Sequence, residues 1–191
     1  LDIIPSTVDL AAAEISLVSM PDREKVLKNI LENIKESYDF IMIDCQPSLG
    51  LLTVNALTAS NSVIIPMQCE FYALDGLTQL MNTIRLVKFH LNPDIDVEGV
   101  VRTMKDNRSN LINQVSQEII KFFKSKVFDT YIPRNIRLAE APSHGLPIVL
   151  YDPASKGAEA YLSLAEEFLN RNKIKYKSIT KHTKIKLREV K

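Results

Sequence analysis

Glycine is scarce in this sequence, which has 5 glycines among 191 residues. They are scattered along the chain, at Gly50, Gly76, Gly99, Gly145 and Gly157. A loop that holds phosphates through its backbone N–H groups needs closely spaced glycines followed by lysine. The sequence therefore contains no phosphate-binding loop of that kind.

Cysteine and long hydrophobic runs are also scarce. Cys45 and Cys69 lie in or beside apolar stretches, and together with three dispersed histidines they show no zinc-ligand spacing. No secretory hydrophobic segment opens the sequence, and no uninterrupted apolar run reaches the roughly 18 residues that span a bilayer. We therefore expect a soluble protein of the reducing cytosol without a disulfide framework.

What the sequence does contain is enough apolar material for a core, because 46% of its residues are hydrophobic. We expect one domain over residues 1–169, followed by a basic, disordered tail over residues 170–191. The tail carries nine Lys or Arg against one acid, a net +8, and since the whole chain is +1 the remainder is −7. A basic tail fits a polyanionic partner or a merely solvated extension.

Short runs rich in Val and Ile alternate with segments of helical periodicity. Uniformly apolar runs are typical of strands covered on both faces of a parallel sheet. The pattern predicts an α/β fold: a doubly wound, mostly parallel sheet with helices on both faces. The predicted strands are residues 1–4, 40–43, 63–65, 97–103 and 127–132, and the predicted helices are residues 24–35, 51–59, 74–91, 111–123 and 157–169.

Ligands bind such sheets beyond the carboxyl ends of the strands. The residues that follow the predicted strands are therefore the candidates for a site, and they are residues 5–7, 44–50, 66–70, 104–108 and 133–137.

Asp44 is the sharpest local signal, because it ends the apolar run Phe40–Ile41–Met42–Ile43. A hydrophobic strand that ends in a carboxylate is the Walker B arrangement, in which Asp44 would hold Mg²⁺ directly or through water beside nucleotide phosphates. Pro47 would stiffen the following loop, and Gly50 would let a backbone N–H approach a phosphate. A lone aspartate at a strand end also occurs as a turn former or a helix N-cap.

Three stretches of the sequence resemble segments of one known protein family, and they are residues 44–60, 64–77 and 132–145. The first is similar to the switch II segment of the ParA/Soj family of chromosome and plasmid partitioning ATPases, and the other two resemble later segments of that family. The resemblance covers about residues 1–169. It implies a P-loop NTPase-like fold that lacks its N-terminal βα unit or units.

Two departures from the family pattern stand out. The family commonly has a second proline where this chain has Gln46, which loosens the switch loop but removes no ligand. The family also begins with a strand, a Gly-rich deviant Walker A loop with two lysines, and a switch I aspartate, and the sequence shows none of them. We therefore expect an N-terminally truncated chain that contains no catalytic lysine and is inactive alone, although the intact family member would be an ATP hydrolase.

The resemblance also implies two sets of binding residues. In the family, the positions of Met104, Pro133, Arg134 and Asn135 flank the adenine base, with Met104 supplying an apolar face and Pro133 a backbone carbonyl. Those of Arg108 and Arg137 contact DNA phosphates without reading sequence. From the residues alone, loop packing and solvated surface arginines remain the alternatives.

The function implied by the resemblance is DNA partitioning. ATP and Mg²⁺ would bind at the strand ends and drive a homodimer that coats DNA on the nucleoid. A ParB-type centromere-binding partner would then stimulate hydrolysis. Two alternatives are a nucleotide-independent, catalytically dead binding module and a MinD-like, membrane-cycling division regulator. The tail disfavours the second, because residues 173–177 alternate with period two rather than at helical spacing, and no membrane contact is expected.

Overall fold

The computed structural model describes residues 1–46, 50–70, 73–106 and 108–176. These residues form two compact units, the first comprising Leu1–Val63 with Asp75–Glu98 and the second comprising Ile64–Leu74 with Gly99–Lys191. No helix in the described part of the chain is long and apolar enough to cross a membrane.

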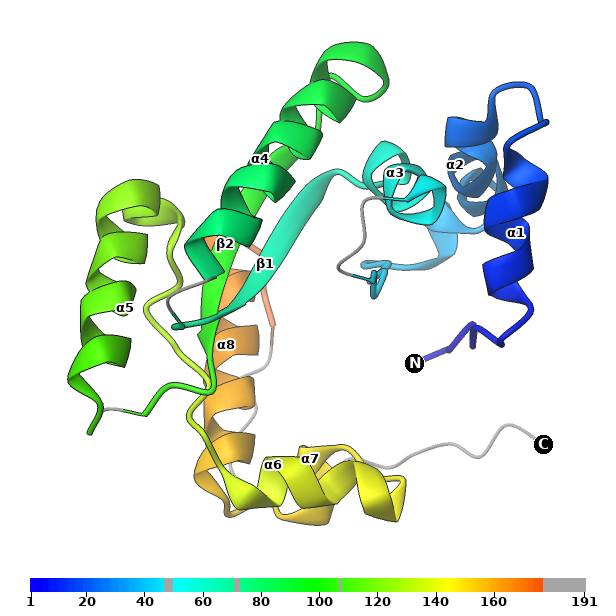
Figure 1. Cartoon of the computed structure of the whole chain (residues 1–191). Helices are drawn as coiled ribbons and strands as arrows, with labels where there is room; N and C mark the ends of the chain where they lie inside the picture. Colours follow the sequence, from blue (N-terminus) through cyan, green and yellow to red (C-terminus); the bar gives the residue numbers. More distant parts are fainter. Residues whose placement is uncertain (47–49, 71–72, 107, 177–191) are drawn as a thin grey trace. The chain divides into compact units, whose positions relative to one another are not determined.

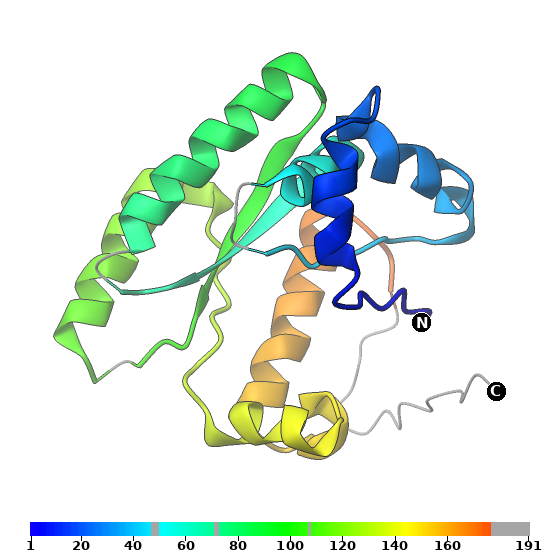
Figure 2. The ribbon, with the colours of Figure 1, turned by 45° about the vertical axis from the view of Figure 1, so that its right-hand side comes forward.

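The first unit is mainly helical. Its N-terminal part contains α1 (Leu10–Leu17), a 3-10 turn (Arg23–Lys25), α2 (Val26–Glu32), a second 3-10 turn (Lys35–Ser37) and α3 (Leu51–Ala59). In Figure 2, α1 and α2 both lie beside α3. The sequence correctly predicts α3, but the helix predicted over residues 24–35 is interrupted, and α1 was not predicted.

The buried side chain of Asn55 joins these helices. Its Nδ2 atom donates to the carbonyls of Arg23 (2.7 Å) and Leu51 (3.0 Å), and its Oδ1 atom accepts from the N–H of Leu27 (3.1 Å). A buried amide whose donors and acceptor are all used fixes its neighbours in one arrangement. Asn55 therefore holds α2 and the turn before it against α3.

Helix α4 (Ala73–His90) follows the prediction for residues 74–91. One side of the helix faces a core, because Leu77, Ile84 and Val87 are buried and Leu80 and Met81 are half-buried. On the opposite side of the helix Leu86 and Phe89 are exposed.

Two strands, β1 (Ser62–Gln68) and β2 (Asp96–Thr103), form a parallel sheet (Figure 1). Residues 127–133 run parallel to β2 on its other side, with bridges from Val100 to Val127 and from Lys105 to Pro133. The predicted strand over residues 127–132 is thus present as isolated bridges. The parallel α/β arrangement is confirmed.

Helices of the second unit are α5 (Asn110–Phe123), α6 (Ile136–Glu140), α7 (Ile148–Tyr151) and α8 (Lys156–Arg171). Figure 1 shows α6 and α7 against the first turns of α8. Two of them, α5 and α8, match the predictions, whereas α6 and α7 are too short to show a periodicity. Because α8 continues to Arg171, this residue belongs to the helix and not to the tail expected from residue 170.

The core of the second unit is built on Phe128, which is fully buried and packs with Val101 and Ile132. Gly99 makes this possible, because a Cβ atom there would lie 2.4 Å from the Phe128 ring. The guanidinium of Arg171 covers the ring at 4.2 Å, so the end of α8 is fixed on this core.

Two predicted strands are absent. Residues 1–4 and 40–43 have no strand pairing among the described residues, and Leu1, Ile3, Ile4 and Met42 are between 73% and 106% exposed. A strand is stable only when a neighbour satisfies its backbone groups and its apolar face is covered. These runs are apolar but have no such neighbour among the described residues. One hydrogen bond links the two parts of the chain: the hydroxyl of Tyr38, just before residues 40–43, donates to the carboxylate of Asp2 at 2.9 Å.

Candidate functional site

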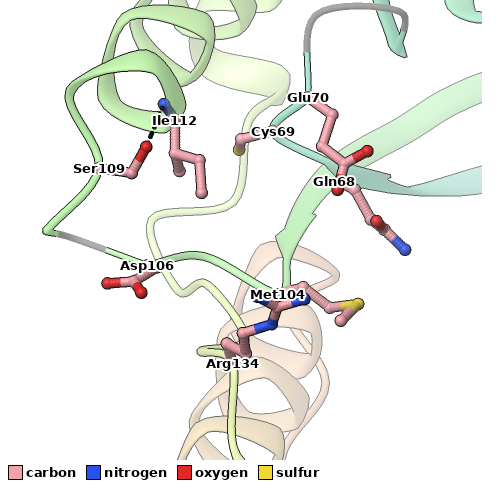
Figure 3. A pocket seen from close by; sticks show the side chains of 8 residues that line it. All are labelled: Gln68, Cys69, Glu70, Met104, Asp106, Ser109, Ile112 and Arg134. Carbon is pink, nitrogen blue, oxygen red and sulfur yellow. Dashed lines mark hydrogen bonds between the residues drawn. The ribbon is translucent and has the colours of Figure 1, made fainter.

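A cavity of about 250 Å³ opens in the second unit where the parallel segments end (Figure 3). Two strands contribute their carboxyl ends, β1 through the residues after Gln68 and β2 through those after Thr103, and the segment after Pro133 adds a third side. Its lining residues are Gln68, Cys69, Glu70, Met104, Asp106, Ser109, Ile112 and Arg134. This is the position at which an α/β sheet binds ligands.

The cavity has one apolar side and several polar groups. Met104, Ile112 and Cys69 supply the apolar atoms, and Ser109 caps α5 by accepting a hydrogen bond from the N–H of Ile112 at 3.4 Å (Figure 3). Burial raises the pKa of the Cys69 thiol, against the opposing charges of Arg102 and Lys105, so the thiol is neutral at neutral pH.

Met104 is held in an unusual backbone conformation. Its φ is 50°, in the left-handed region that residues with a Cβ atom rarely adopt. The next residue, Lys105, is fixed through both of its backbone groups. Its N–H donates to the carbonyl of Ile132 (3.1 Å), and its own carbonyl accepts from the N–H of Arg134 (3.1 Å). Strained residues of this kind cluster at ligand sites.

Asp106 connects the cavity to Arg108. Its carboxylate accepts from Arg108 Nε at 3.0 Å and from Nη2 at 2.7 Å, and also from the Arg108 backbone N–H at 3.0 Å. These hydrogen bonds lower the pKa of Asp106 to about 2, so the carboxylate is ionised throughout the neutral range. The Arg108 side chain is 90% exposed.

Arg137 lies at the start of α6, where the Asn135 side chain accepts from its backbone N–H at 2.8 Å as an N-cap. Its guanidinium pairs with Glu140 at 2.9 Å and with Asp152 at 3.3 Å. The hydrogen bond from Arg137 lowers the pKa of Glu140. Both DNA-contact candidates are thus exposed or half-exposed and paired with carboxylates of their own unit.

The Walker B candidate lies in the first unit. Asp44 is exposed in a segment without regular structure, and Gly50 precedes α3 in an extended conformation. The first N–H of α3 is bound by Glu14, whose carboxylate accepts from the N–H of Leu51 at 2.9 Å. Pro47 lies outside the described residues. Among the residues that the structure describes, no group of three His, Cys, Asp or Glu side chains could hold a metal ion.

The structure thus brings together some of the predicted site residues. Met104 and Arg134 both line the cavity, and Pro133 and Asn135 flank Arg134 in the chain as half-buried residues that do not line it. Sequence reasoning had selected the strand ends that contain the other lining residues but had not singled out Gln68, Cys69, Glu70 or Asp106. Ser109 and Ile112 are added by the start of α5.

A single Mg²⁺ ligand from the protein is nevertheless a workable arrangement, because Mg²⁺ keeps several waters and takes further ligands from substrate phosphates. The exposed carboxylate of Asp44 fits that role and needs no second acidic side chain. A site for three protein ligands would not fit the described residues.

Residues 1–97 match the family model described as an AAA domain. The chain is 63% identical over 167 residues to the sporulation initiation inhibitor protein Soj of Bacillus subtilis, covering 87% of this chain and 66% of that protein. It is 52% identical over 172 residues to the chromosome partitioning protein ParA of Myxococcus xanthus, covering 90% and 61%. This chain therefore spans somewhat under two thirds of these relatives' length.

Among solved structures, the chain is similar to the cobyrinic acid a,c-diamide synthase of Mycobacterium smegmatis with bound ADP and magnesium. The two share 35% identity with a TM-score of 0.73, over 88% of this chain and 62% of the other. The fold and the strand-end cavity place the protein among the α/β proteins of P-loop NTPase-like fold. Its relatives define the group more closely: the chain belongs to the ParA/Soj family of chromosome-partitioning ATPases.

Proposed function

We propose that this chain carries the base-binding and DNA-binding parts of a partitioning ATPase that binds DNA without sequence preference when it is loaded with ATP and Mg²⁺. The observation that carries the proposal is the cavity at the ends of the parallel segments, with Met104 and Arg134 in its wall. Both residues are among the four that the family resemblance assigns to the nucleotide base, and the other two, Pro133 and Asn135, flank Arg134 in the chain.

The size of the cavity supports a base rather than a whole nucleotide. Its 250 Å³ is slightly below the roughly 300–1,000 Å³ of complete small-molecule sites. An apolar side formed by Met104 and Ile112 suits the face of a planar base, and the polar groups suit its edge. In the same proposal Asp44 holds Mg²⁺ and Gly50 lies close to a phosphate.

The phosphate-binding loop and its lysines would come from the part of the relatives' length that this chain does not span. ATP would then drive a homodimer, and a ParB-type partner would stimulate hydrolysis. In the same proposal residues 1–169 belong to the ATPase domain and residues 170–191, apart from the end of α8 at Arg171, form a separate basic tail.

The doubly wound sheet would also be completed in the longer protein, with residues 1–4 and 40–43 as additional strands. A chimera in which the N-terminal segment of the Bacillus subtilis relative precedes this chain tests this point. In hydrogen exchange the amides of residues 40–43 should exchange orders of magnitude more slowly in the chimera than in the chain alone. Unchanged exchange there, with α5 equally protected in both, would refute the added strands.

DNA binding should depend on Arg108 and Arg137. In the chimera with ATP, Arg108→Ala and Arg137→Ala should each weaken binding about three- to tenfold at low salt, equally on unrelated duplexes, and each should flatten the salt dependence by roughly one phosphate contact. Fluorescence polarisation measures both quantities. Lys121→Ala, which removes an exposed cation of α5, is the matched control. Parent-like affinity in both arginine variants would end the proposal for these residues.

A nucleotide-independent binding module is the second candidate, favoured by the lack of a Gly-rich, Lys-containing loop in this sequence. Titration with a fluorescent ATP analogue separates the two. Binding by the chimera and not by the chain alone supports the ATPase, whereas no binding by either supports the module.

A further inference from the structure

Both DNA-contact candidates already carry an anionic partner. The Arg108 guanidinium makes a bidentate contact with the carboxylate of Asp106, through Nε at 3.0 Å and Nη2 at 2.7 Å. The Arg108 side chain is 90% exposed, whereas the Asp106 side chain is 24% exposed. Asp106 is also fixed by the Arg108 backbone N–H and by its place in the cavity wall. The Arg108 side chain is therefore exposed to solvent, while the carboxylate that pairs with it is held in place.

Arg137 is paired in a similar way, but by two carboxylates. Glu140 lies one helical turn further along α6 at 2.9 Å, and Asp152 approaches from the end of α7 at 3.3 Å. Glu140 is itself held by the hydroxyl of Tyr151, which donates to it at 3.2 Å, and the Tyr151 ring stacks on His144 with centroids 4.8 Å apart. This second partner set is also anchored by the fold.

We propose that Asp106, and the pair formed by Glu140 and Asp152, are built-in competitors of DNA phosphate for Arg108 and Arg137. The inference rests on the proposed DNA-binding function. A carboxylate and a phosphate present the same kind of oxygen pair to the planar guanidinium fork. DNA must therefore displace these carboxylates or approach against their negative charge.

The competition lowers DNA affinity by a limited amount. Exposed ion pairs are weak because water and salt screen them and because two side chains must be ordered. Each partner set should therefore reduce affinity by about two- to fivefold. Such a reduction weakens DNA binding without preventing DNA from reaching Arg108 and Arg137.

The test is a gain of DNA affinity. In the ATP-loaded chimera, Asp106→Asn should tighten binding to a duplex by about two- to fivefold, and so should the double change Glu140→Gln with Asp152→Asn. Asparagine at position 106 keeps an oxygen for the Arg108 backbone N–H, so the loop is preserved. Glu118→Gln, which removes the same charge from an exposed pair with Lys121, is the control and should change affinity by less than either.

Alanine backgrounds decide whether the gain acts through the arginines. The gain from Asp106→Asn should vanish when Arg108 is alanine, and that from the Glu140 and Asp152 changes should vanish when Arg137 is alanine. Equal gains in both backgrounds, or no gain at all, would overturn the inference. If the arginine variants themselves leave DNA binding unchanged, the proposed function fails instead. If they weaken binding and the carboxylate variants do not strengthen it, only the competition fails.

Discussion

Replacing Asp44 with alanine in the chimera is expected to reduce ATP turnover by about 10²–10³-fold. In the proposed site Asp44 holds the Mg²⁺ that stabilises the charge developing on the transferred phosphoryl group by several kcal/mol, so losing this carboxylate should remove much of that effect. Because Asp44 is exposed and follows the proposed strand over residues 40–43 without being part of it, the fold should survive the substitution. Phosphate release under saturating ATP and Mg²⁺ measures the change.

The control for this prediction is Asp39→Ala. Asp39 is also an exposed aspartate and lies at the other end of the same apolar run. It should retain the turnover of the parent. Equal turnover in the parent and the Asp44 variant would remove Asp44 from the mechanism, and equal losses in both variants would show that the segment matters only for its fold.

Phe128→Ala is expected to destabilise the protein by about 3–5 kcal/mol, because the ring is fully buried and its removal leaves a cavity. The end of α8 should loosen as well, because the Phe128 ring supports the guanidinium of Arg171 at 4.2 Å. Urea unfolding followed by circular dichroism measures the loss. The matched control is Phe122→Ala, whose ring is 67% exposed and should cost less than about 0.5 kcal/mol.

An unfolding midpoint for Phe128→Ala within error of the parent would contradict the packing described for the second unit. A large loss in the Phe122 variant would place an unrecognised contact on the outer face of α5. These two phenylalanines therefore test which residues form the core independently of any assay of nucleotide or DNA.

The helices with a clear apolar stripe could be predicted from the sequence. In α5, Val115, Ile119 and Phe123 recur at every fourth position and are all buried, which is the period that a helix imposes. Strands were predicted less well, because a run of apolar residues says nothing about whether a neighbour is present to pair with it. Residues 40–43 have the composition of a buried strand and remain unpaired.

The site was partly predictable for a similar reason. The rule that ligands bind beyond the ends of parallel strands selected residues 104–108 and 133–137, and Met104, Asp106 and Arg134 of these segments line the cavity. The partners of the two arginines were not foreseen. Asp152 is 15 positions from Arg137 in the sequence, and only the packing of α6 and α7 brings it within 3.3 Å. Asp106 is two residues from Arg108, but sequence alone does not show that its carboxylate turns back onto that guanidinium.

A crystal structure of the chimera with a non-hydrolysable ATP analogue and Mg²⁺ tests the central claim most directly. We expect the base against Met104 in the strand-end cavity and the Asp44 carboxylate bound to Mg²⁺, either directly at about 2.1 Å or through one coordinated water. A nucleotide bound elsewhere, with Asp44 remote from the metal, would contradict the account.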